Sequence, residues 1–300
     1  MNGASTRLPA LAVAFAAVMW GLWWIPVRWL ADGGLYGDWA SLALFGVTSA
    51  LIAPLAFARR RQLAAGGIDL MLSGALFGAM MVLWNHAVLI GEVVRVILLF
   101  YLAPVWATLL AATVLRERIG VWRILAVVLG LAGAAVVLGF EAGWPVPRGP
   151  ADWLGLVSGL FFALSATLAR RAEAVSGLDK TLVSYITAAG VALVLVLADP
   201  RPAPSGAIVI AAMPLAVATS ILFILPATWL VFWGAARLDP GRVAILLLLE
   251  LIAAAIAAAI LTQEPFGLRE ATGCVLILLA GLAEAVPDLR GAARRPRATP

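Results

Sequence analysis

The stretch Arg95-Val96-Ile97-Leu98-Leu99 decides the fold, because most of the segment that it begins occurs twice in the chain. Moved forward by 147 positions, it falls on Arg242-Val243-Ala244-Ile245-Leu246, and the same shift without a gap places Glu117 on Glu264. In a chain this rich in alanine, valine and leucine, the polar identities carry more weight than the apolar ones. A repeat of nearly half the chain length predicts two related halves.

The composition points to a membrane protein. Hydrophobic residues make up 64% of the chain and charged residues 12%, and the mean hydropathy is +1.04, far above the soluble range. With one cysteine and one histidine, a disulfide framework, a zinc site or a haem site is not expected, so we predict no cofactor. The net charge of +5 comes from arginines in short loops between apolar segments, which favours membrane topology over nucleic-acid binding.

Ten segments are long and apolar enough to cross a lipid bilayer as helices. They lie near 9–30, 38–58, 68–90, 93–115, 121–140, 153–171, 179–198, 208–236, 242–262 and 268–287. The predicted fold is therefore an all-α polytopic membrane protein. Its predicted parts are a first five-helix repeat, a linker, a second five-helix repeat and a basic cytoplasmic tail, at 1–140, 141–152, 153–287 and 288–300.

The basic residues predict the orientation. With a cytoplasmic N-terminus, 16 lysine and arginine residues fall on the cytoplasmic side and five on the other, as the positive-inside rule requires. Both termini are then cytoplasmic. Because each half has an odd number of spans, the second half is inverted relative to the first, which suits a transporter that works by alternating access.

Several motifs resemble the EamA-type branch of the drug/metabolite transporter (DMT) superfamily, over residues 10 to 287. They are Trp20-Gly21, Leu102-Ala103-Pro104-Val105, Arg116-Glu117-Arg118 and Gln263-Glu264-Pro265. The tryptophan-rich first span is most similar to the YddG-type exporters of aromatic amino acids. One departure is Leu251, which stands where a repeat of Pro104 would be expected. The resemblance implies a central cavity between the two repeats and no prosthetic group.

We therefore expect a monomeric transporter of the bacterial cytoplasmic (inner) membrane that exports small organic solutes, above all amino acids with aromatic or apolar side chains. Proton-coupled export of drugs or metabolites is the first alternative. A membrane-embedded enzyme and a passive pore are the others. One histidine and one cysteine in distant spans make a poor catalytic set, so we do not expect an enzyme.

Glu250 lies near the middle of the ninth span, where an ionisable side chain is costly and normally faces a cavity or a partner. We expect its carboxylate to bind a substrate ammonium group or to carry a proton. The alternative is a protonated carboxyl that is hydrogen-bonded to a neighbouring helix.

Trp84, Asn85 and His86 stand together in the third span. A buried amide or imidazole needs partners, and a substrate carboxylate would be one. The alternative is a hydrogen bond between helices, typically worth about 1 kcal/mol or less in membranes.

Aromatic residues within the spans are predicted to line the substrate site. Trp20 and Trp24 are one turn apart on the first span, Tyr101 lies in the fourth and Trp229 in the eighth. The competing interpretation is ordinary helix packing. Tryptophans nearer the span ends, Trp23 among them, are predicted to anchor the chain at the membrane interface.

Two prolines, Pro104 and Pro226, are predicted hinges, because proline frees a carbonyl and weakens a helix locally. Proline is also simply frequent in membrane helices. Glu117 and Glu264 are expected to form local structural pairs with Arg118 and Arg269.

Overall fold

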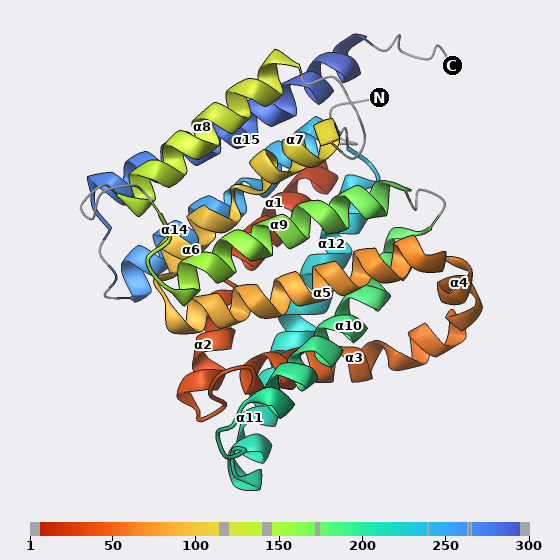
Figure 1. The fold of residues 1–300 in the computed structure, drawn as a ribbon. Coiled ribbons are helices and arrows are strands. Elements are labelled where there is room, and N and C mark those ends of the chain that lie inside the picture. The colour runs from red at the N-terminus through yellow and green to blue at the C-terminus, as the bar shows by residue number, and fades with distance from the viewer. Residues whose placement is uncertain are drawn as a thin grey trace.

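The computed structural model describes residues 7–113, 120–139, 146–171, 175–238, 240–262, 264 and 266–294. These residues form a bundle of helices without strands (Figure 1). In chain order the elements are α1 (Arg7–Gly21), α2 (Trp24–Asp32), α3 (Trp39–Ala58), α4 (Arg60–Ala65), α5 (Gly67–Ile90), α6 (Val93–Phe100), α7 (Ala103–Thr113), α8 (Val121–Leu138), α9 (Pro150–Arg171), α10 (Gly177–Ala198), α11 (Gly206–Thr219), the π-helix η1 (Ser220–Ile224), α12 (Leu225–Ala235), α13 (Pro240–Leu247), α14 (Leu249–Leu261) and α15 (Leu268–Arg294).

The predicted all-α membrane fold is confirmed. Nine helical stretches among the described residues are long and apolar enough to cross a membrane, and the long helix α15 completes the ten. Four spans consist of more than one element: span one is α1 and α2, span four α6 and α7, span eight α11, η1 and α12, and span nine α13 and α14. Much of the predicted linker, residues 141–145, lies outside the described residues.

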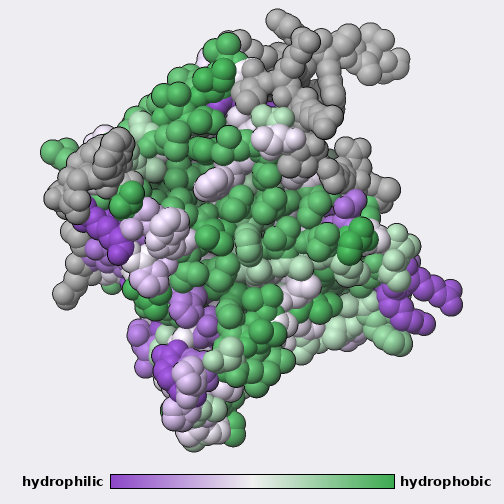
Figure 2. Space-filling model, in the orientation of Figure 1, coloured by the Kyte–Doolittle hydropathy of each residue, from purple (hydrophilic) through white to green (hydrophobic). Residues whose placement is uncertain are grey.

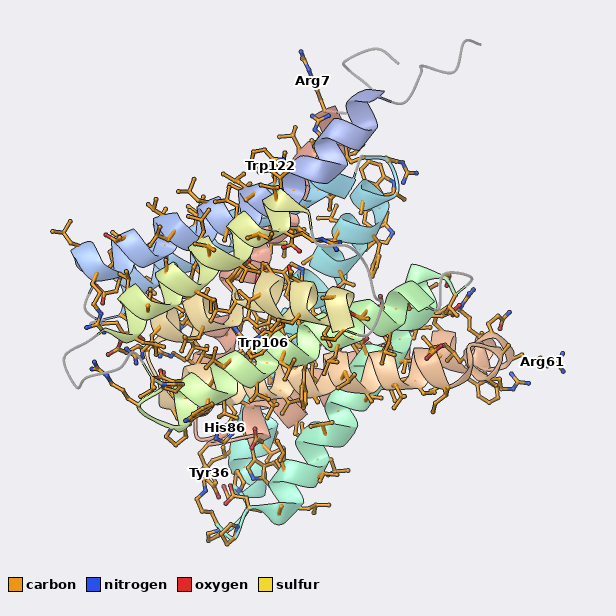
Figure 3. The ribbon with its side chains drawn as sticks, turned by 45° about the horizontal axis from the view of Figure 1, so that its top comes forward. Arg7, Tyr36, Arg61, His86, Trp106 and Trp122 are labelled. Carbon is orange, nitrogen blue, oxygen red and sulfur yellow. The ribbon has the colours of Figure 1, made fainter. Side chains whose placement is uncertain are left out.

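The bundle has two polar ends and an apolar middle. Hydrophobic side chains cover most of the face in Figure 2, and hydrophilic ones gather at the helix ends. We call the end where α1 begins and α15 ends the terminal face, and the end where α2 ends and α3 begins the opposite face. In Figure 3, Arg7 and Arg61 lie at the terminal face, while Tyr36 and His86 lie at the opposite face.

The two halves pack against each other, and the first span of each half makes equivalent contacts with the other half. The first span of the first half, through α1, contacts α12, α13 and α14 of the second half. The first span of the second half, α9, correspondingly contacts α5, α6 and α7 of the first half. In each half, the first span thus packs against the third and fourth spans of the other half. The helices α8 and α15, the last span of each half, pack together at one edge (Figure 1).

Three prolines explain three of the helix interruptions. A proline removes its own backbone donor, and its ring collides with the carbonyl four residues earlier. Pro26 is four residues after Leu22, where α1 gives way to α2. Pro104 similarly follows the gap between α6 and α7, and Pro226 follows the π-helix of span eight.

The fourth interruption, at Leu248 between α13 and α14, has no proline. Leu248 is the residue that the 147-residue repeat places on Tyr101, so the two related spans are interrupted at the same position. Proline alone is not sufficient for a break, because α3 contains Pro54 and α11 contains Pro214 without one. We therefore attribute the break at Leu248 to the backbone shape that the two repeated spans share, because no proline is present to cause it.

Gly21 gives the first test of this packing. A Cβ atom there would collide with the carbonyl oxygen of Glu250 and the Cβ of Ala253, because α1 crosses α14 at this point. Gly21→Ala is expected to destabilise the protein by about 1–3 kcal/mol through overpacking, measured as a lower melting temperature in detergent. Gly46→Ala is the matched control, since a Cβ at Gly46 meets nothing within 4 Å. Equal melting temperatures for the two variants would contradict the close crossing.

Candidate functional site

The interrupted spans meet inside the bundle. Helix α1 contacts α12, α13 and α14, and α14 contacts α6, so helices of the interrupted spans one, four, eight and nine are connected through α1 and α14. Interrupted helices leave backbone groups outside the regular hydrogen-bond ladder, and in membranes they occur where protein or a cavity covers them. Transporter sites are commonly built at such places. This junction of four breaks is the candidate site.

Glu250 lies at the junction. It occupies the first turn of α14, directly after the break at Leu248. Its carboxyl interacts with the Tyr101 hydroxyl, at the break of span four. Its backbone carbonyl lies against Gly21, at the break of span one. Three of the four breaks thus converge on one acidic residue, and Glu250 and Tyr101, both predicted from the sequence, are brought together.

An aromatic cluster lies at the break of span one. The ring of Trp23 is 6.0 Å from that of Trp20 and 5.9 Å from that of Phe223, between centroids. Together with Ile224 and Ala227, these rings line a hollow of about 110 Å³ that has no room for a water molecule. The rings at the break of span one therefore pack closely against one another in this conformation.

Two buried indole groups near the breaks lack partners. Within the described part of the chain, neither the Nε1 of Trp24 nor that of Trp106 has a hydrogen-bond partner. Trp24 is 3% exposed, and the guanidinium of Arg28 lies over its ring, 5.4 Å from the centroid. Trp106 lies on α7, and its Nε1 atom is also buried (Figure 3). A buried donor without a partner is costly, so both groups are available to an acceptor brought in by a ligand.

Asn85 and His86 have protein partners instead. The Asn85 side chain is fully buried, accepts a hydrogen bond from Trp23 Nε1 (2.7 Å) and donates one to Ser41 Oγ (3.1 Å). His86 Nδ1 lies 3.0 Å from each carboxylate oxygen of Asp38. These contacts join the first three spans and match the interhelical alternative. The neighbouring Trp84 packs against the hydrophobic core and is partly buried.

The exposure of two tryptophans bears on the roles predicted for them. Trp23, predicted to be an interface anchor, is 3% exposed; that prediction is wrong, because Asn85 offers its indole N–H an acceptor inside the bundle. Trp229, predicted to line the site, is 61% exposed on α12 and stacks on Trp233 at 5.9 Å.

Ion pairs close the opposite face. Arg28 donates to Glu264 Oε1 (2.9 Å) and to the carbonyl oxygens of Val88 (3.0 Å) and Gly91 (2.9 Å). The expected pairing of Glu264 with Arg269 is wrong, since Arg269 donates instead to the carbonyl of Val137. The partner of Glu264 is 236 residues away in sequence, and local spacing could not reveal it. Glu117 lies outside the described residues.

A second clamp on this face was also missed. Arg95 donates to both carboxylate oxygens of Asp152 (2.6 and 2.7 Å), tying the start of α6 to the start of α9. The sequence did contain an indication of both ion pairs. Arg28 and Arg95 lie within apolar segments, where an unpaired cation is costly and a carboxylate partner is therefore expected.

In a loop of the same face, the Arg201 side chain donates three hydrogen bonds to Asp199 and its backbone N–H a fourth, and together they lower the pKa of that carboxyl to about 2. The Arg201 guanidinium also lies over the Tyr36 ring, 4.9 Å from its centroid. Asp199 therefore stays ionised across the physiological pH range. Among the described residues, no group of three or more His, Cys, Asp and Glu side chains could hold a metal ion.

A family model for the EamA-like transporter family matches residues 7–139 and again residues 149–283. The chain belongs to the EamA-like transporter family. The two matches correspond to two repeated halves of a multi-pass membrane protein from the DMT superfamily. Among solved structures, the chain resembles a crystal structure whose description names no function, at 19% identity and a TM-score of 0.57, over 97% of this chain and 99% of the other. No curated protein matches the chain. Membership makes transport the general function and leaves the substrate open.

The pair between Arg28 and Glu264 is testable as a closing contact of this transporter fold. The two side chains are 25% and 14% exposed, so solvent screens the pair only in part. A double-mutant cycle with Arg28→Gln and Glu264→Gln is expected to give a coupling of roughly 1–2 kcal/mol in unfolding experiments. The same cycle on Arg201 and Asp199, where the arginine is 53% exposed, is the control and should give a smaller coupling. Equal couplings would show that Arg28 and Glu264 contribute no more than a surface pair.

Proposed function

We propose that the protein exports small organic solutes from the bacterial cytoplasm, and that amino acids with aromatic or apolar side chains are its preferred substrates. The observation that supports this most is the position of Glu250, a carboxyl at the junction of interrupted spans, opposite Tyr101 and against Gly21 at the break of span one, where the aromatic cluster lies. A carboxylate recognises an ammonium group, and the adjoining rings suit a flat or apolar side chain.

The remaining part of an amino acid, its carboxylate, needs donors. The unpartnered indole N–H groups of Trp24 and Trp106 lie on the same two spans as Gly21 and Tyr101, which adjoin Glu250. A substrate carboxylate would relieve the cost of these buried donors. One carboxyl, two indole donors and several rings therefore match the three parts of an aromatic amino acid.

Alternating access would use the helix breaks and the ion pairs. In this conformation the Arg28–Glu264 and Arg95–Asp152 pairs close the opposite face, which the positive-inside rule makes extracytoplasmic. Release of substrate to that side requires Arg28 to leave Glu264, and the proline-associated breaks are where spans one, four and eight would bend. Pro104 and Pro226 remain proposed hinges on this basis.

Proton-coupled export of drugs or metabolites is a second candidate, because the Glu250–Tyr101 pair could equally hold and release a proton. The two functions differ in what the carboxyl does during transport. As an ammonium ligand it contributes to substrate affinity, whereas as a proton carrier it couples flux to the pH gradient.

Glu250→Gln separates these roles in proteoliposomes. If Glu250 binds the ammonium group, its neutralisation removes a charge-assisted hydrogen bond and should raise KM for phenylalanine by about 10- to 100-fold with a smaller change in maximal rate. Glu92→Gln, at an exposed carboxyl directly before α6, is the matched control and should leave KM unchanged.

An unchanged KM together with loss of gradient-driven flux and retained downhill exchange would instead identify Glu250 as the proton carrier. Wild-type values for both parameters would exclude Glu250 from either role.

A further inference from the structure

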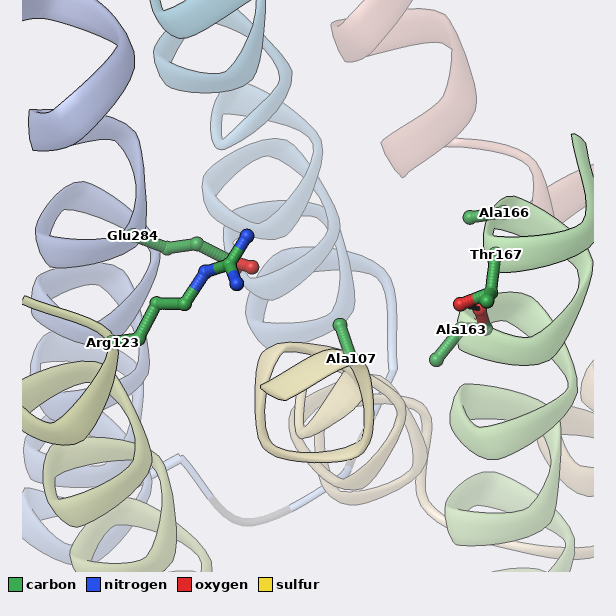
Figure 4. A pocket seen from close by; sticks show the side chains of 6 residues that line it. All are labelled: Ala107, Arg123, Ala163, Ala166, Thr167 and Glu284. Carbon is green, nitrogen blue, oxygen red and sulfur yellow. Dashed lines mark hydrogen bonds between the residues drawn. The ribbon is translucent and has the colours of Figure 1, made fainter. Parts of the chain in front are cut away.

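A cavity of about 130 Å³ lies between α7, α8, α9 and α15, away from the junction of helix breaks. It is lined by Ala107, Arg123, Ala163, Ala166, Thr167 and Glu284, none of which lines the central aromatic hollow (Figure 4). Three alanines leave the space open where larger side chains would fill it. The cavity lies toward the terminal face, since Arg123 is in the first turn of α8.

Its charged groups come from two different helices and have opposite signs. Figure 4 shows the side chains of Arg123, on α8, and Glu284, on α15, pointing toward one another at one wall. Both already have interactions within the chain, so a ligand would share these groups rather than find them unused. Charges at this depth are costly in a membrane unless they are paired, which favours a ligand that preserves the charge balance.

On the opposite wall, Thr167 supplies a hydrogen-bonding oxygen. Its hydroxyl donates to the carbonyl of Ala163 (2.8 Å), so the lone pairs of Oγ1 are left to accept from an N–H group. The cavity therefore presents a cation for an oxyanion, a carboxylate for an ammonium group and an additional acceptor. Its volume is close to that of an engineered cavity of roughly 150 Å³ that binds benzene, and so admits a group of that size.

We propose that this cavity is a second binding site, for a zwitterion that carries a primary ammonium group and an acidic oxyanion. Arg123 binds the oxyanion, and Glu284 binds the ammonium together with Thr167. Two sources share this chemistry: a small amino acid from the cytoplasm, and the headgroup of phosphatidylethanolamine in the inner leaflet. The first source rests on the proposed amino-acid export, for which the cavity would be an entry site. The second does not.

The full-length protein tests both sources. In nanodiscs made from equal parts of phosphatidylethanolamine and phosphatidylglycerol, native mass spectrometry measures which lipid is retained after delipidation. In nanodiscs of phosphatidylglycerol alone, calorimetry measures the binding of L-alanine. We expect selective retention of phosphatidylethanolamine or saturable binding of alanine, weakened at least tenfold in both Arg123→Gln and Glu284→Gln.

Two further variants keep the result interpretable. Ala166→Leu fills the cavity from an exposed position without touching either charge, and should remove the ligand while leaving the melting temperature within a few degrees of wild type. Arg60→Gln, an exposed cation at the terminal face, is the matched control and should bind as wild type does.

Equal retention of both lipids with no alanine binding would overturn the proposal, as would binding that is unchanged in Arg123→Gln, Glu284→Gln and Ala166→Leu. Alanine binding that is lost in Glu250→Gln but kept in those three variants would also overturn it, while leaving the proposed transport function intact.

Discussion

The structure depends on one constraint: inside a bilayer, every backbone N–H and C=O group must find its partner within the protein. Uninterrupted helices meet this requirement alone, and α8 and α15 do so at the edge of the bundle. Interruptions need cover from neighbouring helices. The breaks of spans one, four, eight and nine lie in packed helices: α1 contacts α12, α13 and α14, α14 contacts α6, and the π-helix of span eight is covered by α3. The same arrangement that satisfies the backbone brings Gly21, Tyr101 and Glu250 together.

The proposed chemistry arises where the two halves differ, not where they repeat. The repeat places Ala103 on Glu250 and Tyr101 on Leu248, so the acidic group and its hydroxyl partner each have an apolar counterpart. The backbone break is shared by both copies, whereas the carboxyl exists in one. Duplication therefore supplies the scaffold, and divergence at a few positions supplies the groups that we propose to recognise the substrate. A single carboxyl also avoids two like charges close together at low dielectric, which would disfavour ionisation of both.

The features that could be predicted are those that depend on residues close together in the sequence. The ten spans follow from apolar length, and Glu250 is conspicuous as an acid within the alanine-rich ninth span. The features that could not be predicted are contacts between helices that are far apart in the sequence. Trp20 and Trp24 have the same spacing as Trp229 and Trp233, yet Trp24 is buried and Trp229 is exposed, because periodicity gives a shared face but not what that face meets. For the same reason the Arg28–Glu264 pair and the burial of Trp23 against Asn85 could not be predicted.

The central claim is tested most directly by flux of radiolabelled phenylalanine into liposomes that contain the purified protein, with and without an imposed pH gradient. The account predicts saturable flux without the gradient, competed by tryptophan and leucine and absent from protein-free liposomes. Conductance or leakage without saturation would indicate a passive pore. Flux of phenylalanine under neither condition would contradict the account and direct the search to other metabolites and drugs transported by the wider superfamily.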